Sequence, residues 1–389
     1  MKRRQFIRLA GGGVVFAAVA GSAGCSSELP AEALAPWNGP GAEPDLRRWL
    51  LGHAILAPHS HNLQSWLADL RTPGEITLRV DRSRLLPETD PFSRQIMMSH
   101  GTFLEMLDLA ARERGMRADI ALFPEGEFGP LKLDDRPVAR IRLAADPAVA
   151  KDPLFGQILR RHTNRSAYDP QRTVPAEAWL AMAMAMAAAG AAPGLRFGHV
   201  GADDAQALAT HRAIANEAWR IELVTPRTVM ESFRVLRVGA AEVAQHRDGL
   251  SLMDPKVVLL ERLGLFDRSR PPAPDDYATT SQITDFNAKL ASTPGFLWMV
   301  SEGNGRATQI AAGRAYARVQ LAATARGLAM QPLQQALQEY PEQAAPHAAI
   351  HRLLGAPQPA QTLQMWARVG YAPAVQPAPR RALDAFIQS

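Results

Sequence analysis

The sequence is poor in cysteine, in excess charge and in long apolar runs, and each shortage excludes a class of protein. Cys25 is the only cysteine among 389 residues, so no disulfide can form within the chain. No apolar run after residue 24 is long enough to cross a bilayer. The net charge is +5, but residues 1–24 hold four basic residues and no acidic one, so the body gives no electrostatic case for binding nucleic acid.

What is present begins with the pattern of an export signal. The basic stretch KRRQFIR, Lys2–Arg8, precedes a run rich in glycine and alanine that is too short for a stable transmembrane helix. The adjacent Arg3 and Arg4 resemble a twin-arginine signal peptide over residues 1–24. This resemblance implies export through the twin-arginine pathway to the periplasm or the cell envelope. An ordinary secretory signal with incidental arginines is the alternative interpretation.

Cys25 follows small residues at the end of this run, an arrangement that resembles a bacterial lipobox. Acylation of Cys25 would make the chain a membrane-anchored lipoprotein, whereas cleavage after Ala20 or Ala23 would leave a free cysteine. We therefore expect contact with a membrane only through the signal or through a lipid anchor. Residues 25–44, rich in proline, alanine and glutamate, are expected to form a linker.

The body of the chain mixes helical and strand patterns without strict alternation, which favours an α+β fold. The expected helices cover 45–57, with Asp45 as the N-cap, 93–114, 175–189, 203–247 and 306–327. The expected strands cover 75–80, 118–124, 138–145, 195–200, 295–301 and 362–371. These elements divide into an N-terminal half, 45–150, and a C-terminal half, 151–389. The Pro-rich segment 248–292 is long and irregular for a connection, and we expect it to be a lid insertion.

Four short stretches concentrate side chains that bind ligands. They are Pro58–Gln64 (PHSHNLQ), Arg160–Arg165 (RRHTNR), Gly327–Gln334 (GLAMQPLQ) and Arg368–Tyr371, which is followed by Arg380 and Arg381. Guanidinium groups suit the bidentate binding of a phosphate, while hydroxyls and amides suit the carbonyls and nitrogens of a ring. Surface salt bridges are the alternative role for these arginines.

A metal site and a hydrolase triad both fit these stretches less well. The histidines near the first stretch are His53, His59, His61 and His100; no two of them have the His-x-x-x-His spacing, and no cysteine ligand accompanies them. We therefore expect no metal. No G-x-S-x-G motif occurs, so Ser60 beside a histidine does not indicate a nucleophile.

Together the stretches resemble motifs of the FMN-dependent nitroreductase superfamily. APHSHNLQSW, Ala57–Trp66, resembles its A-P-S-x-x-N-x-Q-P-W motif, called the asparagine motif below. RRHTNRSAY, Arg160–Tyr168, resembles its R-R-x-S/T-x-R/K-x-F opening, called the arginine motif below. GRAYARVQLAATARGLAMQPL resembles the core helix of the family and the turn after it, and RVGY with the later PRR resembles its closing segment.

The order of the motifs implies a fusion. In an ordinary member the arginine motif comes first, and two subunits build each flavin site. Here the asparagine motif comes first, so the chain resembles the fused, Acg-like branch, in which two nitroreductase-like halves form an intramolecular pseudo-dimer. Neither RRWLLGH, 47–53, nor AAPGLRFGHV, 191–200, completes a second site. The resemblance therefore implies one complete site and mainly a monomer, because the fusion already supplies the dimer interface.

The resemblance also implies FMN as the cofactor and suggests which residues bind it. The asparagine motif would supply Pro58, His59, Ser60, Asn62 and Gln64, with Trp66 packed behind them. The arginine motif would supply Arg161, His162, Thr163 and Arg165 to the phosphate and the edge of the isoalloxazine ring. Over the ring would lie Pro332, Leu333 and Gln334. The phosphate candidates near the C-terminus are Arg368, Arg380 and Arg381, of which Arg381 is preferred.

The implied activity is a flavin-mediated two-electron reduction of a nitroaromatic, a quinone or a similar small-molecule acceptor. No protein side chain is assigned as catalytic, because the flavin carries the chemistry. The first alternative is an exported protein that binds or sequesters FMN beneath the lid, with little turnover by NAD(P)H. The second is a structural or interaction protein with a degenerate site.

Overall fold

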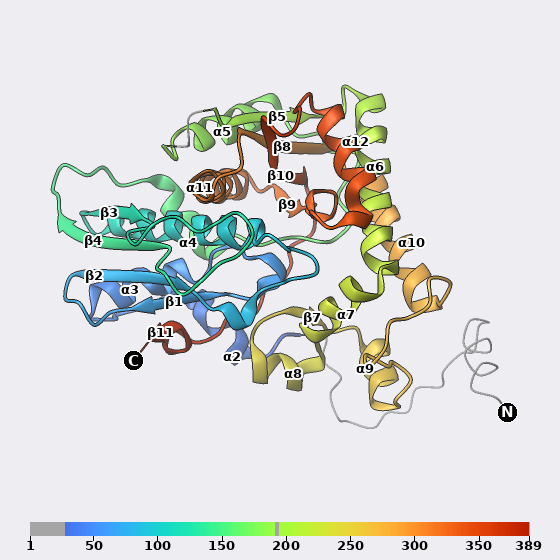
Figure 1. Ribbon diagram of the computed structural model, residues 1–389, viewed down its shortest axis with the longest axis horizontal. Helices are drawn as coiled ribbons and strands as arrows, with labels where there is room; N and C mark the ends of the chain where they lie inside the picture. Colours follow the sequence, from blue (N-terminus) through green and yellow to red (C-terminus); the bar gives the residue numbers. More distant parts are fainter. Residues whose placement is uncertain (1–27, 191–193, 389) are drawn as a thin grey trace.

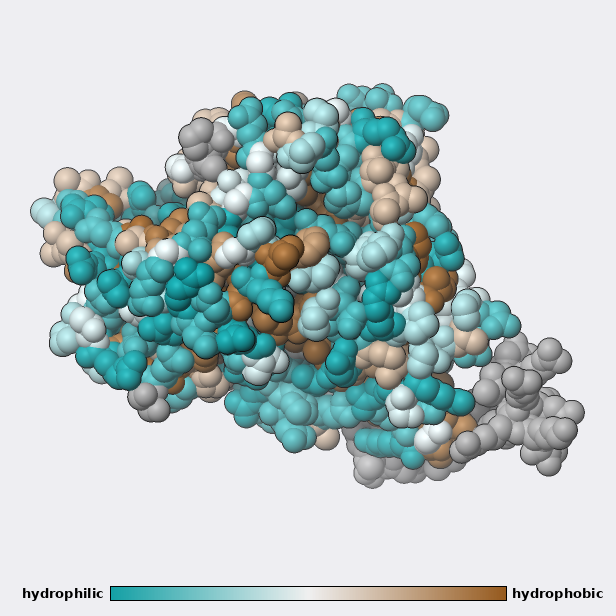
Figure 2. Space-filling model, viewed as in Figure 1, coloured by the Kyte–Doolittle hydropathy of each residue, from teal (hydrophilic) through white to brown (hydrophobic). Residues whose placement is uncertain are grey.

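The computed structural model describes residues 28–190 and 194–388 and places the two larger of its three β-sheets on either side of a pair of long helices (Figure 1). The expected signal peptide, 1–24, and Cys25 lie outside the described residues. Within the described ranges, no helix is long and apolar enough to span a membrane. The face shown in Figure 2 is mostly hydrophilic, with apolar residues in small groups, since most large apolar side chains lie in the cores.

The first sheet is built by the N-terminal half and completed by the end of the chain. Its strands, in the order β11-β1-β2-β4-β3, are β1 (Trp66–Asp69), β2 (Glu75–Val80), β3 (Met116–Leu122), β4 (Ala139–Ala145) and β11 (Ile387–Gln388). Alternate residues of β2 are buried, as its sequence pattern predicts. β11 pairs in parallel with β1. The C-terminal half, 151–389, therefore supplies one strand to the sheet of the N-terminal half.

The second sheet is antiparallel and buried on both faces. Its strands, in the order β5-β8-β10-β9, are β5 (Arg196–Val200), β8 (Gly295–Glu302), β9 (Ala329–Pro332) and β10 (Gln361–Gly370). Leu297 and Met299 of β8 belong to one hydrophobic core, while Phe296 and Val300 belong to another. Neighbouring residues of a strand point to opposite faces, so the nearly continuous apolar run GFLWMV fits a central strand.

Two long helices, α4 (Arg94–Glu113) and α11 (Arg306–Thr324), pack against each other between the sheets (Figure 1). Met98 of α4 joins the core of the second half, and Ile310 of α11 joins the core of the first. Glycines permit the close approach of the two backbones. A Cβ atom on Gly313 would lie 1.9 Å from the carbonyl oxygen of Met98, and one on Gly101 would lie 2.1 Å from that of Ile310.

The remaining helices cover the outer faces. They are α2 (Ala31–Leu34), α3 (Leu46–Ala54), α5 (Ala176–Ala187), α6 (Ala205–Val224), α7 (Pro226–Arg234), α8 (Gly239–His246), α9 (Pro255–Arg262), α10 (Tyr277–Ala291) and α12 (Ala344–Leu353). Asp45 caps α3 as expected, since its carboxylate accepts from the backbone N–H of Arg47.

Two expectations for the helical region after residue 200 were wrong. The helix expected over 203–247 is divided into α6, α7 and α8, because Pro226 starts a new helix and the short strand β6 (Leu236–Val238) follows. The segment 248–292 is not irregular, since it contains β7 (Leu250–Leu252), α9 and α10. α10 is ordered by packing, as its Phe286 stacks on Trp219 of α6 with ring centroids 4.9 Å apart.

The linker expected over 25–44 is also corrected. Residues 31–38 form α2 and the 3₁₀ helix η1 (Ala35–Asn38), and Trp37 is only 8% exposed. The indole N–H of Trp37 donates to the carbonyl oxygen of Ala378 at 2.8 Å, and Ala33 accepts from the backbone N–H of Arg380 at 2.9 Å. Burying an indole is favourable enough to dock a Pro-rich segment that composition alone would leave free.

We predict that Gly313→Ala lowers the free energy of unfolding by about 3 kcal/mol, because the added Cβ atom would overlap the Met98 carbonyl oxygen. Urea denaturation followed by circular dichroism measures the change. Gly156→Ala is the matched control, since a Cβ atom there meets nothing within 4 Å. Equal stability of the two variants would contradict the close packing of α4 on α11.

Candidate functional site

The asparagine motif forms a strained turn between α3 and β1. It contains the 3₁₀ helix η2 (Ser60–Asn62), and three of its residues have positive φ angles: 48° at His61, 54° at Asn62 and 55° at Gln64. Left-handed conformations are costly for residues other than glycine and persist where surrounding contacts impose them. The conformation of this turn must therefore be held by its neighbours.

The first neighbour is α4, which fixes the start of the motif. The backbone N–H of Ser60 donates to Ser99 Oγ at 3.1 Å, and the Ser60 hydroxyl donates to Gln95 Oε1 at 3.2 Å. Thr102 Oγ1 donates to the carbonyl oxygen of Pro58 at 2.7 Å. The Ser60 side chain therefore points toward α4.

The ring of His59 closes the turn from inside. His59 Nε2 accepts from the backbone N–H of Ser65 at 3.1 Å, and Nδ1 lies 2.7 Å from the carbonyl oxygen of Ser60. Trp66 is fully buried and packs edge-on against this ring, with centroids 5.0 Å apart. Both ring nitrogens of His59 are thus used within the motif.

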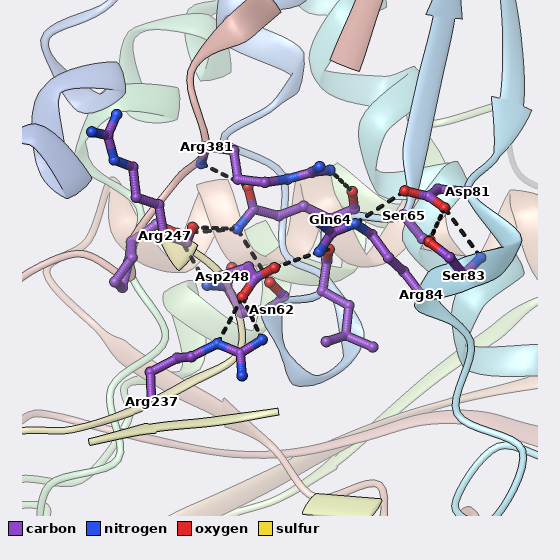
Figure 3. Close-up of polar contacts among 12 residues, drawn as sticks. Asn62, Gln64, Ser65, Asp81, Ser83, Arg84, Arg237, Arg247, Asp248 and Arg381 are labelled. Atoms are coloured by element: carbon purple, nitrogen blue, oxygen red, sulfur yellow. Dashed lines mark hydrogen bonds and ion pairs between the residues drawn. The ribbon is translucent and has the colours of Figure 1, made fainter. Parts of the chain in front are cut away.

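The later residues of the motif bind two distant segments (Figure 3). Asn62 Nδ2 donates to the carbonyl oxygen of Pro379 at 3.0 Å, and Gln64 Nε2 donates to that of Arg247 at 3.0 Å. Gln64 Oε1 accepts from the backbone N–H of Arg381 at 3.0 Å. The two amides therefore join the motif to the C-terminal tail and to the loop before β7.

A buried carboxylate anchors this loop (Figure 3). Asp248, which is 3% exposed, pairs with Arg84 and accepts two hydrogen bonds from Arg237, at 3.0 and 2.8 Å. The next residue, Gly249, donates its backbone N–H to the carbonyl oxygen of Asn62 at 3.2 Å. Breaking either ion pair would leave a buried charge without a partner, which is costly. The first residues of the segment 248–292 are therefore held against the asparagine motif.

The arginine motif begins where the 3₁₀ helix η4 (Pro153–Arg160) ends, and there Arg161 meets Arg380. Their guanidinium carbons lie 5.4 and 5.2 Å from the centroid of the Trp37 ring, and both groups donate to the carbonyl oxygen of Leu56. The described residues provide no carboxylate partner for either group. Burial lowers the pKa of Arg161 to about 10, and burial together with the charge of Arg161 lowers the pKa of Arg380 well below its usual value.

Arg380 uses all of its donors to hold the protein. A guanidinium has five N–H groups. Those of Arg380 are directed at the oxygens of Ile55, Leu56, Ala57, Asn62 and Pro379. Arg380 therefore binds the carbonyl end of α3 and the asparagine motif at once, which favours a positioning role over direct contact with a phosphate.

Arg381, the candidate preferred from the sequence, lies apart from this pair. Its guanidinium donates to the carbonyl oxygen of Gln64 at 2.6 Å and stacks over the Phe386 ring at 4.3 Å. Its Nε is buried without a partner among the described residues, whereas Arg380, the tail residue that meets Arg161, uses all of its donors. The preference for Arg381 as a phosphate ligand stays a prediction.

Among the buried polar atoms without a partner in the described residues, four belong to the candidate stretches and the core helix. They are Arg161 Nε, Tyr316 Oη, Gln334 Oε1 and Arg381 Nε. The other donors of Arg161 reach Gln320 Oε1 at 3.0 Å and Leu56 at 3.1 Å. Buried polar groups in folded proteins are almost always hydrogen-bonded, so unmatched atoms of this kind indicate a ligand position.

Arg165 is exposed and makes no hydrogen bond or ion pair with the described residues, unlike Arg161. It lies at a hollow of about 410 Å³ that is lined by Thr163, Arg165, Ser166, Lys289, Val375 and Gln376. Burial and the nearby charge of Arg165 lower the pKa of His61 to about 4, so His61 is neutral at pH 7. The fold thus brings the arginine motif beside the asparagine motif, although they come from different halves of the sequence.

The remaining candidates lie on the second sheet. Pro332 ends β9, and the backbone N–H of the buried Leu333 donates to the carbonyl oxygen of Trp366 at 2.8 Å. Gln334 Nε2 lies 2.8 Å from Met365 Sδ. Residues of β10 therefore hold both Leu333 and Gln334 in place.

Arg368 of β10 is fully buried and separate from the Arg161–Arg380 pair. It donates to Gln331 Oε1 at 2.7 Å and to the carbonyl oxygen of Ser166 at 2.8 Å, and it stacks on Tyr168 at 4.0 Å. Arg368 therefore supports the far end of the arginine motif. His162 contacts Trp37 edge-on, with centroids 5.5 Å apart.

The sequence analysis missed one histidine pair and one site residue. His347 and His351 of α12 have the His-x-x-x-His spacing, but His351 Nε2 accepts from the backbone N–H of Leu363 at 3.1 Å and its Nδ1 lies 2.8 Å from the His347 carbonyl oxygen. No cluster of three potential metal ligands occurs within 28–190 and 194–388. Trp37 was missed because it lies in a Pro-rich stretch, where a lone aromatic residue was the only signal.

Comparison with known proteins places the larger part of the chain, including the arginine motif, in one family. The nitroreductase family model matches residues 158–371. The Mycobacterium tuberculosis protein named "Putative NAD(P)H nitroreductase Rv3131" is 27% identical over 356 residues, covering 88% of this chain and 90% of that protein.

Solved structures give two further matches. A nitroreductase with bound FMN from Bacteroides fragilis has 15% identity and a TM-score of 0.34, covering 58% of this chain and 92% of its own. The nitroreductase NfnB from Mycobacterium smegmatis in complex with NADPH has 20% identity and a TM-score of 0.34, covering 59% of this chain and 94% of its own.

We predict that Arg380→Lys lowers the free energy of unfolding by about 2–4 kcal/mol, because an ammonium with three donors cannot replace the five hydrogen bonds of this guanidinium. Thermal and urea denaturation measure the loss. Arg160→Lys is the control, since Arg160 is exposed and makes no hydrogen bond with the described residues. A loss of less than about 0.5 kcal/mol for Arg380→Lys would contradict the positioning role.

Proposed function

The chain belongs to the nitroreductase family, and from this premise we propose that it is an FMN-dependent oxidoreductase. It would carry two electrons from a donor to a nitroaromatic, a quinone or a similar small acceptor. The observation that carries the proposal is the pair of arginines from one motif, Arg161 and Arg165, which retain unmatched donors beside the asparagine motif.

The donor set fits the anionic part of FMN. Arg161 has a buried Nε–H without a partner among the described residues, and Thr163 adds a hydroxyl two residues later. A phosphate accepts charge-assisted hydrogen bonds from such groups and would satisfy the orphaned donor. Arg161, His162 and Thr163 would therefore hold the phosphate end. Arg380 would support them by fixing the end of α3.

The ring of FMN would be held by groups from both halves. Arg165 offers positive charge at the ring edge, where it would stabilise added negative charge. From the asparagine motif, Pro58, His59, Ser60, Asn62 and Gln64 would shape the opposing wall. Pro332, Leu333 and Gln334 would cover the ring, and the unmatched Gln334 Oε1 is suited to accept from a ring N–H. When bound, FMN would supply the electron chemistry that these side chains lack.

His61 would remain neutral during this reaction at pH 7, because its pKa is held near 4. A neutral imidazole beside Arg165 can donate or accept one hydrogen bond without adding a second positive charge. Protons consumed by the acceptor would then come from solvent rather than from this ring.

The two halves would form an intramolecular pseudo-dimer of the fused type. Each half has one sheet and one long central helix, α4 or α11, and the tail of the second half supplies β11 to the first sheet. This arrangement supports a single site between the halves and mainly a monomer in solution. The proposed domain boundaries at residues 45 and 151 follow from it.

The location of the protein is a further part of the proposal. The resemblance of residues 1–24 to a twin-arginine signal supports export to the periplasm. Acylation of Cys25 would hold the chain at the membrane.

A second candidate function is an exported FMN-holding protein with little turnover. It is favoured by the contacts of segment 248–292 with both motifs. At one end Gly249 binds Asn62, and at the other the hydroxyl of Ser292 accepts from the backbone N–H of Tyr168 at 3.0 Å. A segment fixed at both ends of the site would restrict the approach of a nicotinamide.

We predict that Arg165→Ala weakens FMN binding about tenfold or more, because a charge-assisted hydrogen bond is lost while the fold, which makes no bond to this side chain, is kept. Quenching of FMN fluorescence by flavin-free protein measures the Kd. Arg160→Ala, an exposed arginine of the same motif, is expected to bind FMN as the wild type does. Equal Kd values for FMN in Arg165→Ala and Arg160→Ala would contradict the assignment of Arg165 to the FMN site.

A further inference from the structure

The hollow beside the arginine motif is lined by Thr163 and Arg165, which the proposed FMN site uses, and by further groups that it does not use. Ser166 and Gln376 lie on its wall together with Lys289, the only one of its lining residues that comes from α10. Lys289 belongs to segment 248–292. An inserted segment therefore places an ammonium group at the rim of the proposed flavin site.

The charge of this hollow is positive. Arg165 is exposed and unpaired with the described residues, and Lys289 pairs with Asp285 alone, at 2.5 Å. Beneath them Arg368 is fully buried, has no carboxylate partner among the described residues, and donates to the carbonyl oxygens of Ser166 and Lys289. Two cationic side chains, Arg165 and Lys289, therefore line the hollow, and the one carboxylate paired with them, that of Asp285, is mostly exposed.

The neutral groups on the wall are also suited to an oxyanion. The hydroxyl of Ser166, which the proposed FMN site does not use, makes no hydrogen bond with the described residues. Gln376 Oε1 accepts from the backbone N–H of Leu29 at 3.0 Å, so its amide N–H groups remain available. Hydroxyl and amide donors around guanidinium and ammonium groups form the usual setting for carboxylate or phosphate.

The hollow is shallow and wide open to solvent, so a ligand in it would be only partly covered. Thr163 and Arg165 belong to the arginine motif, and Arg161 of that motif donates to the carbonyl oxygen of Leu56, directly before the asparagine motif, so the hollow adjoins the place where the two motifs meet. A ligand in it would have its anionic group at α10 and its body directed toward the motifs.

We propose that this hollow binds the second ligand of the site through an anionic group, carboxylate or phosphate, and that Lys289 determines this specificity. The proposal rests on the proposed function, because it names the class of ligand that exchanges electrons with the flavin. Asp285 limits the strength of the interaction by competing for the ammonium group.

The test uses two matched pairs of probes on the wild type, Lys289→Ala and Asp285→Asn. The first pair is 4-nitrobenzoate and its neutral analogue 4-nitrobenzamide, and the second is NADPH and NADH, which differ by one phosphate. Isothermal titration calorimetry gives each Kd without turnover. Lys256→Ala on α9 is the control for removal of a lysine at a distance from the hollow.

The expected result is that Lys289→Ala weakens the anionic member of at least one pair about tenfold, with less than a twofold change for its neutral or less charged partner. Asp285→Asn is expected to tighten the same probe about two- to fivefold. If only the affinity for 4-nitrobenzoate falls, the anionic ligand is the electron acceptor. If only the affinity for NADPH falls, the anionic ligand is the electron donor.

Equal affinities in wild type and Lys289→Ala for all four probes would overturn the inference. The visible absorbance of the same samples reports on bound flavin separately. Protein that lacks flavin yet binds 4-nitrobenzoate through Lys289 would refute the proposed function and leave the anion site standing. Protein that holds flavin but binds the charged and the neutral member of each pair equally well would refute the anion site and leave the proposed function standing.

Discussion

The interaction on which the rest of the structure depends is the contact of two buried guanidinium groups with the carbonyl end of α3. Arg161 and Arg380 donate to backbone oxygens of residues 55–57 while both lie over Trp37. Cations are stabilised at the C-terminal end of a helix, where carbonyl groups lack partners. Three segments distant in the sequence, near residues 37, 161 and 380, therefore meet at one point.

This contact explains how a strained turn can sit at the centre of the site. Asn62 and Gln64 take left-handed conformations, and their amides bind the tail that Arg380 fixes. On the other side Asp248 anchors the loop that binds the same turn. The turn is held from two directions, so its polar groups can face a ligand in one orientation. Strain of this kind is commonly found at functional sites.

Much of the fold could be predicted from local patterns. The limits of α4, α11, β2 and β10 agree with the periodicity of their sequences within a few residues, and Asp45 caps α3 as expected. Pro226 is a local signal for the division of the region 203–247 that the sequence analysis overlooked. The helix α10 could not be predicted, because the packing of Phe286 on Trp219 orders it. Local propensity does not contain such long-range contacts.

The candidate site was predictable in its motifs and less so in its geometry. The sequence indicated two motifs rich in polar groups, and the fold brings them together. It could not distinguish Arg380 from Arg381, because adjacent residues on an extended tail point in different directions. It also missed Trp37, whose role depends on a contact with Ala378 far along the chain.

The most direct test of the central claim is a visible absorption spectrum of the purified protein, recorded before and after anaerobic addition of NADPH and NADH. The account predicts a bound flavin spectrum that bleaches with one of these donors. A flavin spectrum that persists would contradict the oxidoreductase proposal and favour the FMN-holding alternative. Folded protein that has no flavin bands and does not acquire them with added FMN would contradict the cofactor assignment itself.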